Sequence, residues 1–295
     1  MPDADDRNLL KRAYEAWDAR NWPVAAEALE ALARRHPEHR HAGVWWYDAA
    51  LAHKFLRNWA RAYELGREAA ARAERGTEDP AFWNLGIAAT IMGDWATARD
   101  AWRGYGLPLA DGEGEIVEDL GVTPVRLDPA GRGEVVWARR LCPARAEVLN
   151  VPTPESGRRF KEIVVHDGAP NGEREVDGRS FPVFDELLLW RESPLPTTSV
   201  QVRAATADDV HALVAVFTER GYGAEPASGV RAICACCSEG SVASDPDHVV
   251  HGEQRVSLAA PPEEIPGLLE AWRGGAPEWR SWTPEVPDGE SPAGR

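Results

Sequence analysis

The chain has 295 residues, enough for two or three domains, and carries a formal charge of −15. An acidic chain without clusters of Lys and Arg repels phosphate, which argues against generic binding of nucleic acid or of anionic membranes. No apolar run is long enough to span a bilayer and residues 1–6 do not resemble a secretion signal, so we expect a cytoplasmic protein. The strong bias toward Arg over Lys is typical of GC-rich bacterial genomes.

An internal repeat extends over residues 7–105. Three Trp residues, each preceded by Asn or Asp, recur at spacings of 37 and 36 residues, at Asn21-Trp22, Asn58-Trp59 and Asp94-Trp95. Small residues recur in the same phase, at Ala13 and Ala25, at Ala50 and Ala62, and at Gly86 and Ala98. Because two helices of a hairpin approach closely only where side chains are small, this pattern predicts three helix pairs.

The repeat resembles a known family. Its third copy, Phe82-Trp83-Asn84-Leu85-Gly86 followed by Gly93-Asp94-Trp95-Ala96-Thr97-Ala98, is similar to the tetratricopeptide repeat (TPR) consensus. This resemblance implies an all-α solenoid of three helix pairs with a groove that holds another polypeptide. The family's groove positions correspond here to Leu10, Tyr14, Trp17, Val44, Tyr47, Leu51, Lys54, Trp83 and Ile87.

The groove implied by the resemblance is aromatic and mostly apolar. Arg7 and Lys54 are almost its only basic residues, which disfavours a clamp for an acidic C-terminus. A hydrophobic peptide or a partner helix fits this composition. The alternative occupant is a later domain of the same chain.

A change of pattern follows the repeat. Residues 106–120 are rich in Pro, Gly and acidic side chains and predict a linker or an extended crossing segment. From 121 to 195, alternation with a period of two predicts a small antiparallel β domain with a hairpin turn at Asp177-Gly178. The expected strands are 135–140, 146–151, 162–165, 173–176, 181–184 and 186–190.

The β domain contains one polar cluster. A His beside an Asp, as at His166 and Asp167, is able to serve as an oriented general base. However, residues 166–172 include Asp-Gly and Asn-Gly pairs, which a tight loop needs for conformational reasons alone. No nucleophile motif, phosphate loop or dinucleotide fingerprint accompanies the pair.

Residues 199–282 predict a ferredoxin-like α+β module. The order strand, helix, strand, strand, helix, strand matches a split βαβ arrangement. The first helix has an N-cap at Thr206 with an acidic residue three positions on, Asp209, and ends at Gly221. The expected strands are 199–204, 230–234, 254–259 and 278–282, and the second helix covers 265–272. Residues 283–295 read as a disordered tail.

Four residues between the central strands of this module predict a zinc site. Cys234 and Cys237, with His248 and His251, supply the thiolate and imidazole ligands that tetrahedral zinc prefers, and Cys236 is an alternative thiolate. Two other interpretations stay open: redox-reactive thiols, or small buried cysteines beside histidines on a solvated loop.

Two functions from different classes are compatible with these observations. The first is an interaction or regulatory protein that binds a protein or peptide in the TPR groove, with zinc as a structural cofactor. The second is a metal-assisted enzyme in which His166, Asp167 and the cysteines share one cleft and the repeat presents a polypeptide substrate.

Overall fold

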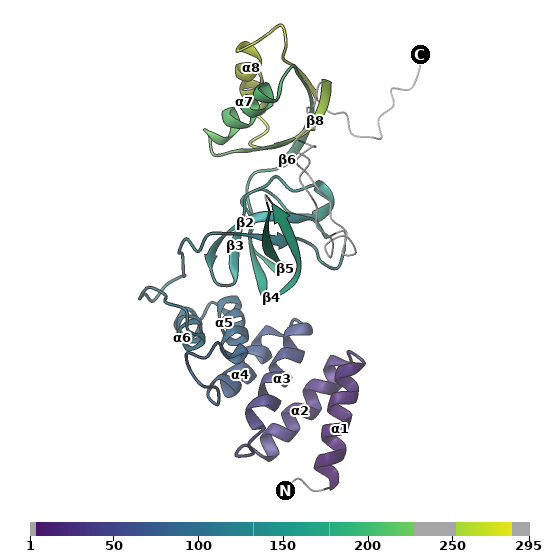
Figure 1. Ribbon diagram of the computed structural model, residues 1–295, viewed down its shortest axis with the longest axis vertical. Coiled ribbons are helices and arrows are strands. Elements are labelled where there is room, and N and C mark those ends of the chain that lie inside the picture. Colours follow the sequence, from purple (N-terminus) through teal and green to yellow (C-terminus); the bar gives the residue numbers. More distant parts are fainter. Residues whose placement is uncertain (1–3, 132, 177, 227–251, 285–295) are drawn as a thin grey trace. The chain divides into compact units, whose positions relative to one another are not determined.

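The computed structural model describes residues 4–131, 133–176, 178–226 and 252–284 (Figure 1). The chain divides into two compact units, one up to Glu118 and one from Asp119 onward, with residues 142–144 grouped with the first. The first unit is helical, and the second contains two β-sheets and two α-helices, so the chain is a mixed α+β protein.

The first unit contains six helices that pack in sequential pairs, each against the next along the chain (Figure 1). They are α1 (Ala4–Asp18), α2 (Trp22–Arg35), α3 (Ala42–Phe55), α4 (Trp59–Ala70), α5 (Pro80–Met92) and α6 (Trp95–Tyr105). This arrangement is compatible with the helical repeat predicted for the region.

Each pair turns at the same point of the repeat. Arg20, Arg57 and Gly93 lie 37 and 36 residues apart, and their φ angles are 54°, 55° and 72°. The following residue is the N-cap of the second helix in each pair. A left-handed residue that ends one helix directly before the cap of the next therefore defines the hairpin.

The predicted small residues lie where helices meet. Ala13, Ala25 and Ala98 have no exposed surface. At Gly86 a Cβ atom would lie 2.6 Å from the indole of Trp102, which is itself fully buried. Glycine at this position is therefore required by the large side chain on α6 that packs against it.

The segment between α6 and the first strand packs on the helical unit and is not a free linker. Arg99 Nη1 donates to the Gly114 carbonyl at 2.6 Å, and Arg103 Nη2 donates to the Leu109 carbonyl at 2.9 Å and to the Asp111 carboxylate at 2.7 Å. Two arginines one turn apart on α6 thus fix the backbone and charge of this acidic segment.

The second unit begins with a closed five-stranded barrel. Its strands, in spatial order, are β1 (Val122–Arg126), β2 (Val135–Cys142), β3 (Arg145–Val148), β4 (Ile163–Val176) and β5 (Arg179–Arg191). β1 closes the barrel by pairing parallel to β5, so the expectation of a wholly antiparallel domain is wrong in this one pair. The short 3₁₀ helix η1 (Pro154–Ser156) connects β3 to β4.

The long hairpin β4–β5 replaces four expected short strands. Val176 pairs with Arg179, which confirms the predicted turn, and Gly178 has φ 71°. The expected loop at 166–172 lies inside β4, where register shifts absorb the irregular residues.

A second sheet completes the unit. It contains β6 (Thr197–Ala204), β7 (Gly223–Pro226), β8 (Gly252–Ala259) and β9 (Ser281–Pro284) in the order β7-β8-β6-β9, with every pair antiparallel. Helices α7 (Ala207–Thr218) and α8 (Ile265–Gly274) contribute to the same core. The expected strand at 230–234 and most of the expected tail lie outside the described residues.

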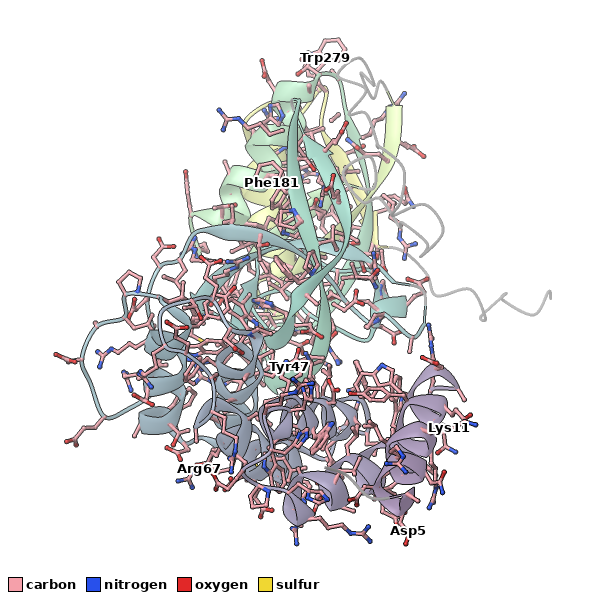
Figure 2. All side chains as sticks on the ribbon, turned by 60° about the horizontal axis from the view of Figure 1, so that its bottom comes forward. Asp5, Lys11, Tyr47, Arg67, Phe181 and Trp279 are labelled. Atoms are coloured by element: carbon pink, nitrogen blue, oxygen red, sulfur yellow. The ribbon has the colours of Figure 1, made fainter. Side chains whose placement is uncertain are left out.

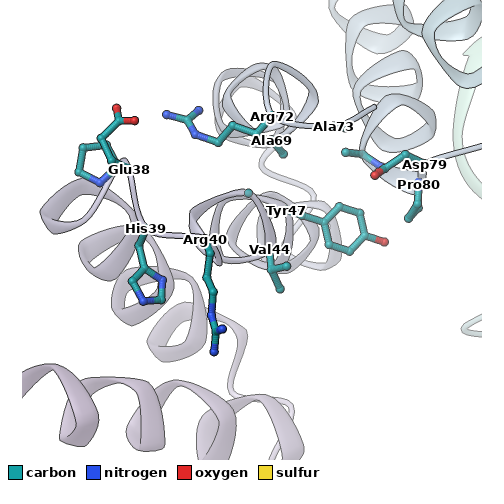
Figure 3. Close-up of a pocket in the computed structure, with 13 residues that line it drawn as sticks. Glu38, His39, Arg40, Val44, Tyr47, Ala69, Arg72, Ala73, Asp79 and Pro80 are labelled. Carbon is teal, nitrogen blue, oxygen red and sulfur yellow. The ribbon is translucent and has the colours of Figure 1, made fainter. Parts of the chain in front are cut away.

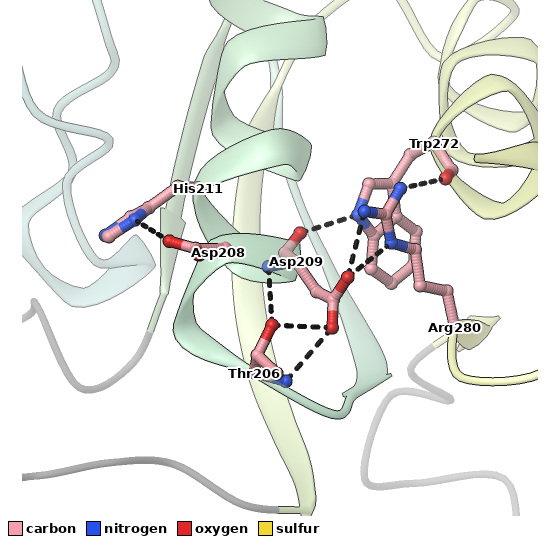
Figure 4. A network of polar contacts seen from close by, with 6 residues as sticks. All are labelled: Thr206, Asp208, Asp209, His211, Trp272 and Arg280. Atoms are coloured by element: carbon pink, nitrogen blue, oxygen red, sulfur yellow. Dashed lines mark hydrogen bonds and ion pairs between the residues drawn. The ribbon is translucent and has the colours of Figure 1, made fainter. Parts of the chain in front are cut away.

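The start of α7 is fixed by a polar network (Figure 4). Thr206 and Asp209 form the predicted capping box, with the Asp209 backbone N–H donating to Thr206 Oγ1 at 3.2 Å. Arg280 Nε donates to Asp209 Oδ1 at 2.9 Å, and Trp272 Nε1 donates to the Asp209 carbonyl at 2.7 Å. Asp209 therefore joins α7 to α8 through its carbonyl, and to the approach to β9 through its carboxylate.

Candidate functional site

The predicted groove positions lie on the first helix of each pair, α1, α3 and α5. Tyr14 is 38% exposed and Val44 is 49% exposed, which makes them the most accessible of the set. Trp17, Tyr47, Leu51 and Trp83 are half-buried. These helices therefore share a surface on which aromatic and apolar side chains are partly accessible.

Hydrogen bonds between equivalent helices connect this surface. The Tyr14 hydroxyl donates to Asp48 Oδ2 at 3.1 Å, which joins α1 to α3. Asn84 on α5 receives a bond from Lys54 Nζ at 2.9 Å and donates one to the Tyr47 hydroxyl at 3.3 Å, which joins α3 to α5. The surface is thus held in place by side chains from all three pairs.

The structure corrects the expected set at two positions. Ile87 has no exposed surface and Lys54 is 7% exposed, so neither side chain is open to a partner. The physical reason for Ile87 is that α5 is apolar at almost every position and is buried around most of its circumference. Lys54 instead orients Asn84.

Two of the expected aromatic residues also belong to packed clusters. The Trp83 ring lies 5.0 Å from the ring of Trp102 and 4.8 Å from that of Tyr105, both edge to face. Trp17 packs 5.2 Å from Trp22. Substitution of either Trp would therefore change stability as well as surface, which makes both poor probes of binding.

A hollow of about 490 Å³ lies at the start of α3, between the α2–α3 connection, the end of α4 and the start of α5 (Figure 3). Tyr47 reaches toward Asp79 and Pro80 at the start of α5, and Val44 lies one turn before it on α3. The rim carries charges of both signs: Arg40, Arg72, Glu38 and Asp79. Its volume is in the range typical of ligand pockets.

Partial burial changes the titration of the Tyr14–Asp48 pair. Loss of solvation, helped by the neighbouring Asp48 charge, raises the pKa of Tyr14 to about 12. Loss of solvation also raises the pKa of Asp48, and the hydrogen bond from Tyr14 opposes that rise.

Charged side chains elsewhere project into solvent, as Asp5, Lys11 and Arg67 do in Figure 2.

Sequence reasoning missed the polar members of the surface. Asp48 and Asn84 stand 36 residues apart and Lys11 stands 37 residues before Asp48, so all three occupy one position of the repeat. The recurrence of polar residues at this position of the repeat was the signal from which the sequence could have identified them. An acid, an amide and a lysine at equivalent positions mark a face whose polarity varies along the repeat.

His166 and Asp167 are not arranged as a base with its orienting carboxylate. His166 Nδ1 lies 2.7 Å from the backbone carbonyl of Asp167, while the Asp167 carboxylate accepts the backbone N–H of Gly168 at 2.6 Å. Burial lowers the pKa of His166 to about 4. At neutral pH His166 is therefore an uncharged, buried imidazole.

The predicted zinc ligands Cys234, Cys237, His248 and His251 lie outside the described residues. Within the described ranges, no group of three or more His, Cys, Asp or Glu side chains is placed to hold a metal ion.

None of the described helices combines the length and apolar character needed to cross a bilayer. The chain matches no known family model, and no curated protein is significantly similar to it.

Proposed function

We propose that the helical unit is a TPR-type solenoid that binds a polypeptide segment on the surface of α1, α3 and α5. The observation that carries the proposal is the hollow beside Val44 and Tyr47, on a surface whose polar side chains are fixed by bonds between pairs. The phased repeat supports the family assignment. The strand order β7-β8-β6-β9 with two helices supports a ferredoxin-like second module.

The proposed occupant is a segment with a large apolar side chain. Val44 and the Tyr47 ring supply apolar contact area in the hollow, and the apolar anchor of a peptide is usually the largest contributor to its affinity. Asp48 retains unused acceptor positions after its bond from Tyr14, and these suit backbone N–H groups of an extended chain. A structural zinc bound by Cys234, Cys237, His248 and His251 is a separate proposal, supported by the ligand types alone.

Selection from a displayed library of random peptides, with the full chain as bait, tests this proposal. We expect enriched peptides to share an apolar anchor. Val44→Asp should weaken their binding at least about tenfold, since it places a charge in the apolar contact.

Val122→Asp is the matched control, because Val122 is 53% exposed and lies on β1, outside the helical unit. Equal losses in the two variants, or no enrichment by the full chain, would contradict the proposal. Absence of enrichment by the full chain would instead favour occupation of the surface by another part of the same chain.

A further inference from the structure

An arginine and a histidine side chain in the barrel both lie close to one aromatic ring. Arg140 Cζ lies 5.1 Å from the ring centre of Phe184, and the His166 ring lies 5.5 Å from the same centre. Arg140 follows Val136 and Ala138 on β2 at intervals of two, and both of these belong to the barrel core. Because residues two apart share a face of a strand, Arg140 is on the interior face of β2.

Each of the two side chains has a nitrogen atom without a partner. Arg140 Nε and His166 Nε2 are buried and have no hydrogen bond within the described part of the chain. His166 is 1% exposed. A buried polar atom without a partner costs free energy comparable to a lost hydrogen bond, so both atoms favour a partner from outside the chain.

Arg140 also lacks a counter-charge among the described residues. Burial is the one cause that lowers its pKa, with no carboxylate opposing it. A guanidinium remains protonated under these conditions. A partly buried cation of this kind favours an anionic oxygen as its partner.

The tautomer of His166 determines what its free nitrogen recognises. A carbonyl oxygen only accepts hydrogen bonds, so Nδ1, 2.7 Å from the Asp167 carbonyl, must carry the proton. In the uncharged ring, Nε2 is then an acceptor and needs a donor from the ligand.

We propose that Arg140 and His166 bind a small oxyanion that also carries a hydroxyl group, of which hydrogen phosphate is the simplest example. The guanidinium of Arg140 donates to the anionic oxygens, and His166 Nε2 accepts the hydroxyl proton in a hydrogen bond. Sulfate matches hydrogen phosphate in shape and charge but has no hydroxyl. It therefore accepts hydrogen bonds from Arg140 but donates none to His166 Nε2.

Nuclear magnetic resonance of the ¹⁵N-histidine-labelled full chain tests the site, with inorganic phosphate and sulfate compared at equal ionic strength and neutral pH. We expect phosphate to shift the His166 Nε2 resonance saturably and to bind about tenfold more tightly than sulfate, the difference that one hydrogen bond provides. Equal affinities would overturn the role of the hydroxyl, and no saturable shift would overturn the site.

Variants of β2 separate binding from folding. Arg140→Gln should abolish the phosphate response, whereas Arg139→Gln, at the exposed neighbouring position, should retain it. Arg140→Lys keeps the charge and should bind more weakly than wild type, which tests the site even where Arg140→Gln fails to fold. An unchanged response in folded Arg140→Gln would show that the guanidinium does not bind the anion.

Discussion

The third helix pair and the two pairs before it share one plan but differ at the turn, at the cap and in the contact between the two helices. The turn residue is Gly93 in the third pair and Arg20 or Arg57 in the others. The cap is Asp94, in place of Asn21 or Asn58. In the third pair the large Trp102 packs against Gly86. The residues equivalent to Trp102 are Leu29 and Gly66, and in both of those pairs the residue equivalent to Gly86 is Ala.

This difference shows how a repeat tolerates divergence. The two residues at this helix contact change from Ala13 with Leu29, through Ala50 with Gly66, to Gly86 with Trp102, so neither the residue types nor their summed volume is conserved along the repeat. The turn and cap, by contrast, are each fixed by one backbone geometry, and there the third pair has the residue types that this geometry favours.

The largest expected effect is that of Gly86→Ala. The new Cβ would lie 2.6 Å from the buried Trp102 indole, so the helices must separate, at a cost of about 3 kcal/mol in the free energy of unfolding. Urea denaturation followed by tryptophan fluorescence measures it. Ala50→Gly, the reverse change at the equivalent position, should cost about 1 kcal/mol, and equal costs would refute the packing argument.

The caps should rank in the order Asp94, Asn58, Asn21. Asp94 accepts from the Thr97 backbone at 3.0 Å and from the Tyr63 hydroxyl at 2.6 Å, so Asp94→Ala should cost about 2 kcal/mol. Asn58 accepts one long bond of 3.4 Å and Asn21 accepts none from its helix, so their Ala variants should lose progressively less. Amide hydrogen exchange in α6, α4 and α2 checks this order.

The same carboxylate predicts a pH dependence. The hydrogen bonds from Tyr63 and Thr97 lower the pKa of Asp94. Its stabilisation is therefore complete above the carboxyl's unfolded pKa and is lost as the pH falls through the lower, folded value. Asp94→Asn should lack this component, and a thermal midpoint that falls equally in both proteins over that range would contradict it.

The smallest effect concerns the turns. Arg57 has φ 55°, a conformation that is strained for a residue with a side chain, so Arg57→Gly should stabilise the helical unit by about 0.5 kcal/mol. Gly93→Ala, at the equivalent site, should destabilise it by about 1 kcal/mol. Thermal unfolding compares the two, and a change of the same sign in both variants would show that the turns are not equivalent.

Local sequence patterns that fit only one backbone geometry predicted the structure correctly. The phased Trp residues predicted the helix pairs, Thr206 and Asp209 predicted the start of α7, and Asp177-Gly178 predicted the β4–β5 turn. Each rests on a backbone geometry that few other residues satisfy, so neighbouring structure has little freedom to override it.

Features that depend on contacts between residues far apart in the sequence could not be predicted from it. β1 contains Pro124, which argues against a strand, yet pairing with β2 and β5 holds it in the barrel. In the candidate site, a sequence cannot show that Lys54 turns toward Asn84 or that Ile87 is buried, because both depend on which helix faces lie next to each other.

The acidic segment held by Arg99 and Arg103 covers the end of the helix array. Tyr63, 36 residues before Arg99, contacts Asp94 and Thr97 of the following pair, so in the second pair this helix position receives the next pair. On α6 the position binds Gly114 instead. A fourth helix pair appended after α6 would have to displace this segment, which therefore acts as a cap for the array at this end.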